Sequence, residues 1–357
     1  MTIADYLDDF EERDWQTTAH GTVRFAVIGL GWWTVDRTIP ALLDSELCDI
    51  TVAVSGSTDK ANDVVDRFEP ITHGITYDEF HHGAASDAYD AIYICSPNAL
   101  HLPYAETAAD LGKAIFCEKP MEASVERAER MVDVASDDDV PLLVGYRMHT
   151  EPAIRRAREL IRDGTIGRPV VALGNNTQSL IDINDDPDQW RLNPDLVGSG
   201  VSVTDIGIYP LNTARFLLDA DPLTAQAQMD STHEFFADVP DERTAFTLSM
   251  DDGTFLASTA SQNAQSSTSL RIVGTDGEIY VEPAFHMETE LRLTRDETTV
   301  DLSTPQVDQM TEILTYFADR ILSGEAIGPD GDHGLVDVRV IEAIYEAAES
   351  DQTVTIQ

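Results

Sequence analysis

The first apolar run of the chain leads directly into a glycine turn, and this junction constrains the fold more than any other feature. Residues 23–28 have the composition of a buried β-strand, Gly29 and Gly31 follow, and helical character appears at 38–43. The two glycines allow a tight turn and the close approach of a dinucleotide pyrophosphate, which the N-terminus of the next helix attracts. Thr34 stands where this motif usually has a third glycine or an alanine, so we expect looser packing of the helix on the strand.

Buried strands and helices then alternate through the first 150 residues. Further strands are predicted at 50–54, 89–95, 115–117 and 141–147, and helices at 61–68, 77–80, 103–111 and 125–135. This alternation is typical of a parallel, doubly wound sheet. We therefore predict that residues 21–148 form an α/β dinucleotide-binding domain of the Rossmann type.

The strand at 115–117 ends in an acid, a base and a proline, Glu118-Lys119-Pro120. The proline ends the strand and holds Lys119 in an extended conformation, so both charges lie at the C-terminal end of the strand. Ligands bind at that end of the strands in an open α/β sheet. On these three residues alone, a surface salt bridge before a turn is an equally good interpretation. Pro120 is also a position where a cis peptide bond can form the turn.

The end of the second strand bears on which nicotinamide dinucleotide would bind. An acidic residue usually lies there in NAD-specific sites and binds the ribose 2′-hydroxyl. Here the strand ends at Ser55, and Ser57, Asp59 and Lys60 follow. Hydroxyl groups and a cation suit a 2′-phosphate, so the sequence favours NADP. Asp59 leaves binding of NAD open.

The pattern changes after residue 150. A helix is predicted at 151–162 and a strand at 168–173, and strand-like alternation then recurs with hairpin turns at 251–253 and 275–277. The later strands are predicted at 223–229, 243–250, 254–260, 268–274, 278–282 and 290–294, and helices at 210–218, 306–322 and 335–349. We expect residues 149–357 to form an α+β domain with a large, open, mostly antiparallel sheet, the C-terminal helix being free to pack back on the first domain. The uncovered face of such a sheet predicts a homodimer or homotetramer interface.

The net charge of the chain limits which classes of molecule it can bind. The chain has 65 acidic and 23 basic residues, a net charge of −42, and lysine only at positions 60, 113 and 119. An acidic, lysine-poor surface is typical of proteins that work in concentrated salt, and it excludes a basic nucleic-acid-binding face.

Residues 1–20 place apolar side chains at helical spacing among acids and predict a short acidic arm. Three cysteines without metal spacing, and no signal-like or membrane-spanning stretch, favour a cytoplasmic protein that does not act on a membrane.

A segment of the second half carries further candidates for a site. Trp190 and Arg191 precede a glycine-rich stretch, and Asp205 and Tyr209 then lie four residues apart. The two residues would share one face of a helix. Asp205 is equally suited to be the N-cap of that helix, so the spacing leaves its role open.

Together these motifs resemble those of the glucose–fructose oxidoreductase (Gfo/Idh/MocA) family. The resemblance covers residues from about 22 to 355 and rests on Gly29-Leu30-Gly31, Ser55-Gly56, Ser96-Pro97-Asn98 with His101, Glu118-Lys119-Pro120, Gly145-Tyr146-Arg147, Gln189-Trp190-Arg191-Leu192 and Asp205-Ile206-Gly207-Ile208-Tyr209. Within this family the chain looks most like the NADP-dependent D-xylose 1-dehydrogenases of halophilic archaea. The resemblance therefore implies oxidation of an aldose at C1, from D-xylose to D-xylonolactone, with the hydride passing to NADP.

The resemblance also implies roles for individual residues. Lys119 and Tyr209 match the catalytic pair of the family and Asp205 matches its acidic partner near the substrate. Tyr209 would take the anomeric hydroxyl proton as a phenolate, the form that the nearby ammonium of Lys119 would favour. The residues implied to bind the cofactor are Gly29, Gly31, Trp32, Trp33, Ser55, Ser57, Lys60, Ser96, Asn98, His101, Glu118, Lys119, Arg147, Trp190 and Arg191.

Two other functions stay open at this point. A dehydrogenase of another sugar or cyclic polyol, such as glucose, arabinose or inositol, would use the same residues, because every ring hydroxyl presents the same bond. A non-catalytic NADP-sensing regulator would share the fold, although the intact lysine, aspartate and tyrosine disfavour it. No metal site is expected, because the histidines are scattered and the pair His81-His82 is adjacent in a polar loop.

Overall fold

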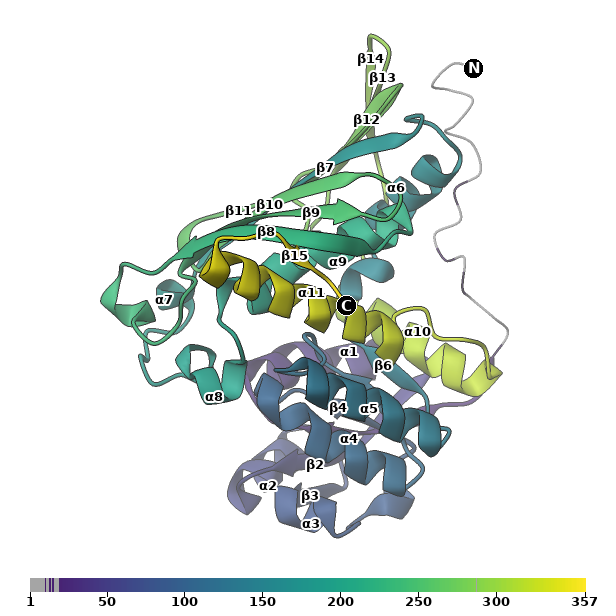
Figure 1. Ribbon diagram of the computed structural model, residues 1–357. Coiled ribbons are helices and arrows are strands. Elements are labelled where there is room, and N and C mark those ends of the chain that lie inside the picture. Colours follow the sequence, from purple (N-terminus) through teal and green to yellow (C-terminus); the bar gives the residue numbers. More distant parts are fainter. Residues whose placement is uncertain (1–9, 11–12, 14, 16–18, 287) are drawn as a thin grey trace. The chain divides into compact units, whose positions relative to one another are not determined.

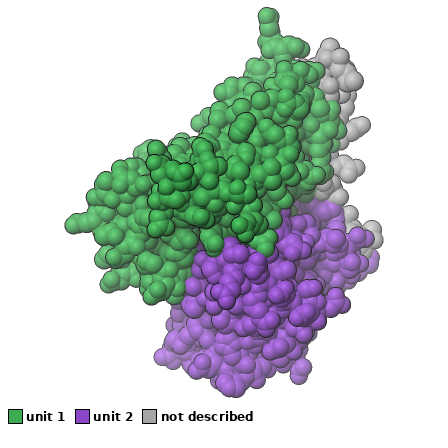
Figure 2. Space-filling model, in the orientation of Figure 1, with its two compact units in different colours: residues 1–14, 148–307, 336–357 green, residues 15–147, 308–335 purple. Residues whose placement is uncertain are grey.

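The computed structural model describes residues 10, 13, 15, 19–286 and 288–357. The chain divides into two compact units, coloured separately in Figure 2: unit 1 comprises residues 1–14, 148–307 and 336–357, and unit 2 comprises residues 15–147 and 308–335. The acidic arm predicted at residues 1–20 falls almost entirely outside the described residues. Within the described part of the chain, no helix has both the length and the apolar character needed to cross a membrane.

Unit 2 is built on a six-stranded sheet in the order β3-β2-β1-β4-β5-β6, in which every neighbouring pair is parallel. The strands are β1 (Val23–Ile28), β2 (Cys48–Ser55), β3 (His73–Thr76), β4 (Ala91–Ile94), β5 (Ala114–Cys117) and β6 (Leu142–Val144). The helices are α1 (Ile39–Asp44), α2 (Thr58–Arg67), α3 (Tyr77–His81), α4 (His101–Asp110), α5 (Val125–Asp137) and α10 (Gln309–Ser323). The predicted parallel, doubly wound Rossmann sheet is confirmed. The short edge strand β3 was not predicted.

Helix α10 joins this unit from a distant part of the sequence (Figure 1). Its Phe317 is fully buried and packs against Phe25 of β1 and Phe116 of β5, with ring centroids 6.3 and 5.7 Å away. Burial of aromatic side chains is a main source of stability, on the order of 2 kcal/mol for each ring that leaves water. The helix therefore packs on the central strands, whose ends carry the candidate site.

Unit 1 is built on a nine-stranded sheet in the order β14-β13-β12-β11-β7-β10-β9-β8-β15. Every neighbouring pair is antiparallel except β7–β10, so the predicted large, mostly antiparallel sheet is confirmed. The strands are β7 (Pro169–Ser179), β8 (Pro222–Asp230), β9 (Arg243–Met250), β10 (Phe255–Ser261), β11 (Asn263–Gly274), β12 (Gly277–Val281), β13 (Leu291–Arg295), β14 (Thr298–Leu302) and β15 (Val354–Thr355). Strands β14 and β15 were not predicted, and β7 is longer than expected.

Helices α6 (Pro152–Arg162) and α9 (Ile208–Leu218) cover one face of this sheet. The other helices are α7 (Leu180–Ile183), α8 (Pro194–Val197) and α11 (Gly331–Ser350), of which residues 336–350 belong to unit 1. Helix α9 lies very close to β7: a Cβ added to Gly174 would be 2.5 Å from Cβ of Pro210, so the approach requires glycine. A buried network also holds α9, because Asp337 accepts hydrogen bonds from Asn212 at 2.7 Å and from Arg215 at 2.6 Å.

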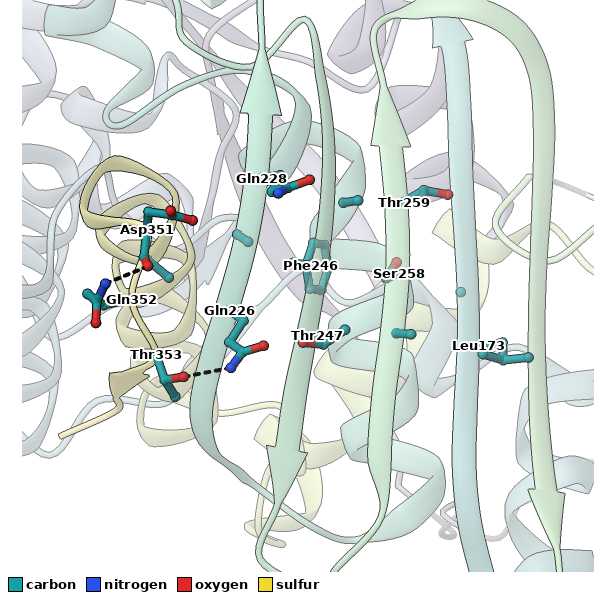
Figure 3. A pocket seen from close by; sticks show the side chains of 15 residues that line it. Leu173, Gln226, Gln228, Phe246, Thr247, Ser258, Thr259, Asp351, Gln352 and Thr353 are labelled. Carbon is teal, nitrogen blue, oxygen red and sulfur yellow. Dashed lines mark hydrogen bonds between the residues drawn. The ribbon is translucent and has the colours of Figure 1, made fainter.

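The other face of the sheet is hollowed over β7–β10 (Figure 3). The hollow measures about 710 Å³, and its rim includes the segment 351–353 after α11, where Gln226 donates to Oγ1 of Thr353 at 2.6 Å. Asp351 is the single charged residue among the 15 that line it. Two large apolar side chains on this face, Leu173 and Phe255, are 40% and 61% exposed.

Candidate active site

The glycine turn after β1 has the geometry that a dinucleotide-binding turn needs. Gly29 has a φ of +88°, and a Cβ there would lie 2.1 Å from the carbonyl oxygen of Cys95, so only glycine fits. A Cβ added to Gly31 would meet no atom within 4 Å, so the space in front of this residue is open. The helical segment that follows begins at Trp32 and contains a π-helical stretch, Thr34–Thr38, before α1.

Thr34 occupies the place of the third glycine in the motif and is fully buried. Among the described residues its hydroxyl has no hydrogen-bond partner, an arrangement that costs stability. The wide π-helical turn starts at this residue, and π-helical turns are wider than α-helical ones. The buried threonine and the change of helix type therefore coincide at this residue.

The end of β2 brings Ser55, Ser57 and Lys60 together at the start of α2. Ser55 is 4% exposed, and its Oγ accepts from the N–H of Ser57 at 3.5 Å. Ser57 is the N-cap of α2, and its Oγ accepts from the N–H of Lys60 at 3.4 Å. The side chain of Lys60 is exposed, and no described carboxylate pairs with its ammonium group. An available cation next to a helix N-terminus suits an anionic group such as a 2′-phosphate.

The ends of β4 and β5 are joined through His101, which is 1% exposed. Its Nε2 lies 3.0 Å from the carbonyl oxygen of Ser96, and its Nδ1 lies 3.1 Å from that of Met121 and 3.3 Å from Sγ of Cys117. In the neutral tautomer in which Nε2–H donates to Ser96, Nδ1 can accept from the Cys117 thiol but makes no hydrogen bond to the Met121 carbonyl oxygen; the other neutral tautomer donates to Met121 and leaves the Ser96 contact unmade. Both ring nitrogens thus face protein groups, while Asn98 beside them is 3% exposed.

Glu118 and Lys119 follow β5, and the Lys119–Pro120 peptide bond is cis, as the sequence suggested. Oε1 of Glu118 accepts from the hydroxyl of Tyr93 at 2.7 Å, and Oε2 accepts from the N–H of Lys119 at 3.3 Å. Burial, followed by the nearby charge of Glu118, raises the pKa of Tyr93 well above its ordinary value. Tyr93 therefore remains a donor and fixes the carboxylate at the end of the strand.

Arg147 lies inside unit 2 and is 8% exposed. Its guanidinium donates to Oε1 of Gln309 at the start of α10 and stands 5.8 Å from the ring centroid of Trp33. Trp33 in turn makes an edge contact with Trp32, which is 56% exposed. Of these candidates for cofactor binding, Trp32 is the exposed one, whereas Arg147 supports the turn from within.

Unit 1 contains three of the candidate site residues, Trp190, Arg191 and Asp205, close to one another. Trp190 and Arg191 lie on a 3₁₀ turn, Trp190–Leu192, and the guanidinium of Arg191 stands 4.6 Å from the ring centroid of Trp190. Nε of Arg191 lies 3.3 Å from Oδ2 of Asp205. Asp205 is on the π-helical stretch Val203–Gly207 and is not the N-cap, which is Ser202. The side chain of Asp205 is therefore engaged away from the helix backbone.

Gln262 and Gln178 complete this cluster, and the sequence analysis missed both. Gln262 is fully buried after β10; its Nε2 donates to Oδ2 of Asp205 at 2.9 Å, and its Oε1 accepts from Nε2 of Gln178 at 2.9 Å. These residues lie 57 and 84 positions from their partners, so no local spacing signals the contact. The amide orients Asp205 because a glutamine can donate from one side and accept on the other.

Tyr209 is the second residue of α9, which directly follows the π-helical stretch, so the spacing of four residues from Asp205 spans about one helical turn. Its ring centroid lies 5.9 Å from that of Phe285. Asn176 of β7 donates to the carbonyl oxygen of Ile206 at 3.0 Å and ties the helical segment to the sheet. The segment that carries Asp205 and Tyr209 is thus fixed to β7 at two places, at Ile206 and at Pro210.

Comparison with known proteins gives the class of this fold and site. The model of the oxidoreductase family with an NAD-binding Rossmann fold matches residues 23–146, and the model of the GFO/IDH/MocA C-terminal domain matches residues 154–280. The chain is 52% identical to the D-xylose 1-dehydrogenase (NADP⁺) of Haloarcula marismortui over 100% of both chains. It belongs to the Gfo/Idh/MocA oxidoreductase family, as the motifs predicted.

Two further relatives agree with this assignment. The D-xylose 1-dehydrogenase (NADP⁺) 2 of Haloferax volcanii is 30% identical, with 93% of this chain and 99% of that one covered. The crystal structure of an aldose-aldose oxidoreductase from Caulobacter crescentus complexed with glycerol has a TM-score of 0.87 and 30% identity. It covers 94% of this chain and 99% of that one.

Proposed function

We propose that the protein is an NADP-dependent dehydrogenase that oxidises an aldose at C1, with D-xylose as substrate and D-xylonolactone as product. The full-length identity of 52% with the Haloarcula enzyme carries this proposal. The residues support it independently, because the glycine turn, the Glu118-Lys119 strand end and the helical segment with Asp205 and Tyr209 are all present and ordered.

Oxidation at C1 removes a hydride from the carbon and a proton from the anomeric hydroxyl group, and it leaves a lactone. Tyr209 acts as the base that takes the proton, and the ammonium of Lys119 stabilises the phenolate. Asp205, oriented by Gln262 and Arg191, accepts hydrogen bonds from the sugar hydroxyls. NADP⁺, when bound, supplies the hydride acceptor. The products are the lactone, NADPH and one proton.

The residues of unit 2 fit such a cofactor. The open space before Gly31 and the N-terminus of the following helix would hold the pyrophosphate, and Lys60 with Ser55 would hold the 2′-phosphate. We assign direct contact to Trp32, Ser96, Asn98, Glu118 and Lys119 in unit 2 and to Trp190 and Arg191 in unit 1. We assign supporting places to Ser57 as N-cap, to His101 under Ser96, and to Arg147 with Trp33 under the glycine turn.

We also propose that a second copy of the chain covers the hollowed face of the unit 1 sheet, giving a homodimer or a homotetramer in a salt-rich cytoplasm. Charge distribution supports this, since one charged residue lines the hollow in a chain in which charged residues make up 25%. A surface that stays in contact with concentrated salt would be expected to carry the acids found elsewhere. Exposed Leu173 and Phe255 on the same face favour the same conclusion.

Steady-state kinetics at molar salt test the proposed function. D-xylose, glucose, arabinose, ribose and inositol are each supplied with NADP⁺ or NAD⁺, and formation of the reduced cofactor is followed by absorbance. We expect the highest kcat/KM with D-xylose and NADP⁺. A higher value with another sugar or with inositol would reassign the substrate within the family. If the protein binds NADPH tightly but no substrate reduces NADP⁺, it is an NADP-sensing regulator and not an enzyme.

A further inference from the structure

The helical segment that carries Asp205 and Tyr209 has a buried carboxylate, that of Asp241, hydrogen-bonded to its first backbone N–H groups. Oδ1 of Asp241 accepts from the N–H of Val201 at 2.7 Å, and Oδ2 accepts from the N–H groups of Ser202 and Val203 at 2.7 and 3.0 Å. The first N–H groups of a helix have no partners within the helix. One fully buried side chain, 38 to 40 residues further along the chain, satisfies three of them.

Two other residues close the space around this carboxylate. The hydroxyl of Tyr345 donates to Oδ2 of Asp241 at 2.6 Å. Burial, together with the charge of Asp241, raises the pKa of Tyr345 well above its ordinary value, so the hydroxyl keeps its proton and remains a donor. A Cβ added to Gly200 would lie 2.3 Å from Oδ1 of Asp241 and 2.7 Å from the hydroxyl oxygen of Tyr345. The backbone at Gly200, the tyrosine and the carboxylate therefore pack so closely that no side chain would fit at Gly200.

The next residue, Glu242, also bonds to the start of this helical segment. The carbonyl oxygen of Glu242 accepts from Oγ of Ser202 at 3.0 Å and from the N–H of Gln262 at 3.0 Å. The side chain of Gln262 then donates to Oδ2 of Asp205 at 2.9 Å. Asp241 and Glu242 thus make hydrogen bonds to the start of the helix that carries Asp205, and Glu242 also makes one to Gln262, which orients the Asp205 carboxylate.

We propose that Asp241 is a positioning residue for proton transfer: its carboxylate, held by three backbone amides and Tyr345, sets the place of the helical segment from which Asp205 and Tyr209 project. It touches neither substrate nor cofactor, and it acts through the helix start. The inference rests on the proposed function, because the effect is assigned to the chemical step at Tyr209.

Asp241→Asn is the central variant, because it keeps the size of the side chain and replaces one acceptor oxygen with a donor. We expect kcat with D-xylose to fall by about tenfold or more, since small displacements of an acid–base group are costly. The deuterium isotope effect on kcat with D-xylose labelled at C1 should rise toward its intrinsic value. Affinity for NADPH, followed by energy transfer from tryptophan, should fall much less than kcat, because most of the proposed cofactor contacts, including the glycine turn, Ser55 and Lys60, belong to unit 2 and only Trp190 and Arg191 belong to unit 1.

Two companion variants make the result decisive. Tyr345→Phe removes one donor and leaves the three amides, so it should give a smaller change of the same kind. Glu151→Gln is the matched control: Glu151 is a buried carboxylate of unit 1 that accepts from Oγ1 of Thr289 at 2.6 Å, away from this helix start. It should lower the unfolding temperature without changing the isotope effect.

Turnover of an aldose by the parent protein, measured first, decides the proposed function separately. If folded Asp241→Asn and Tyr345→Phe retain the parent kcat and isotope effect, Asp241 does not position the catalytic residues. The same conclusion follows if both variants only unfold more easily and keep parent kinetics per folded molecule. If Asp241→Asn does not fold, the isotope effect of Tyr345→Phe decides.

Discussion

Tyr93 and Glu118 are joined side chain to side chain between the adjacent strands β4 and β5, with the tyrosine hydroxyl 2.7 Å from Oε1 of the carboxylate. The bond fixes Glu118 beside Lys119 at the end of the strand. Tyr93→Phe removes the bond without changing the shape of the core. We expect kcat/KM to fall about tenfold and the free energy of unfolding to fall by about 1 kcal/mol, as measured by steady-state kinetics and urea denaturation.

Tyr89→Phe is the control for this variant. Tyr89 is also fully buried in unit 2, and among the described residues its hydroxyl has no hydrogen-bond partner. Removal of an unpaired buried hydroxyl should leave both kinetics and stability unchanged or raise stability slightly. Equal losses of activity in the two variants would show that the Glu118 contact has no special place in the site.

Lys60 should determine the choice between the two dinucleotides. Lys60→Ala removes the cation at the start of α2, so KM for NADP⁺ should rise about tenfold or more while KM for NAD⁺ changes little. Lys113→Ala is the control, because Lys113 belongs to the same unit and lies 5.3 Å from the ring centroid of Tyr89. A similar rise in KM for both dinucleotides would place the 2′-phosphate elsewhere.

Glu242 should make the free energy of unfolding depend on pH. Burial alone raises the pKa of this carboxyl, but the N–H groups of His233 and Thr232 and the amide of Asn263 outweigh it and lower the pKa from 4.5 to about 2. The unfolded chain therefore binds the proton more readily, and stability rises with pH between these values. The contribution, about 3 kcal/mol, is complete above pH 4.5 and is lost as pH falls toward 2.

Glu242→Gln measures this contribution directly. Unfolding free energies of the parent and the variant are compared from about pH 6 down to the lowest pH at which both fold, at constant molar salt. Their difference should shrink as pH falls below 4.5. A difference that stays constant across this range would mean that the carboxyl is not held ionised by its hydrogen bonds.

The hollowed face of the unit 1 sheet should be covered by a second copy of the chain. Phe255→Glu places a charge among the exposed apolar residues of this face, so the oligomer should dissociate toward the monomer in sedimentation velocity runs at molar salt. Ile183→Glu is the control, since Ile183 is 54% exposed on α7. An oligomer that survives the change at Phe255 and dissociates with the change at Ile183 would locate the interface on another surface.

Much of the fold follows from local sequence patterns. The strand, glycine turn and helix at 23–44 are specified by residues next to one another, and the alternation that predicts the parallel sheet is equally local. Strands β3, β14 and β15 escaped prediction because they are short and lie at or near the sheet edges, where few side chains are buried. The local pattern of such strands is weak, and their pairing partners define them.

The candidate site was predicted only where a motif carries it. The spacing of Asp205 and Tyr209 drew attention to them and the family resemblance gave them roles, but Gln262 and Asp241, which bond to Asp205 and to the start of its helix, come from other parts of the chain and belong to no motif. His101 has a motif position, yet the contacts of its two nitrogens depend on the ends of two strands. Packing of distant segments, which no local pattern encodes, decides these roles.

Transfer of the label from D-xylose deuterated at C1 tests the central claim most directly. The protein is incubated with this sugar and NADP⁺ at molar salt, and the reduced cofactor is analysed by NMR. We predict deuterium at C4 of the nicotinamide ring, a primary isotope effect on the rate, and loss of this transfer in Tyr209→Phe by about a hundredfold or more. Reduced cofactor without deuterium, or undiminished transfer in Tyr209→Phe, would contradict the account.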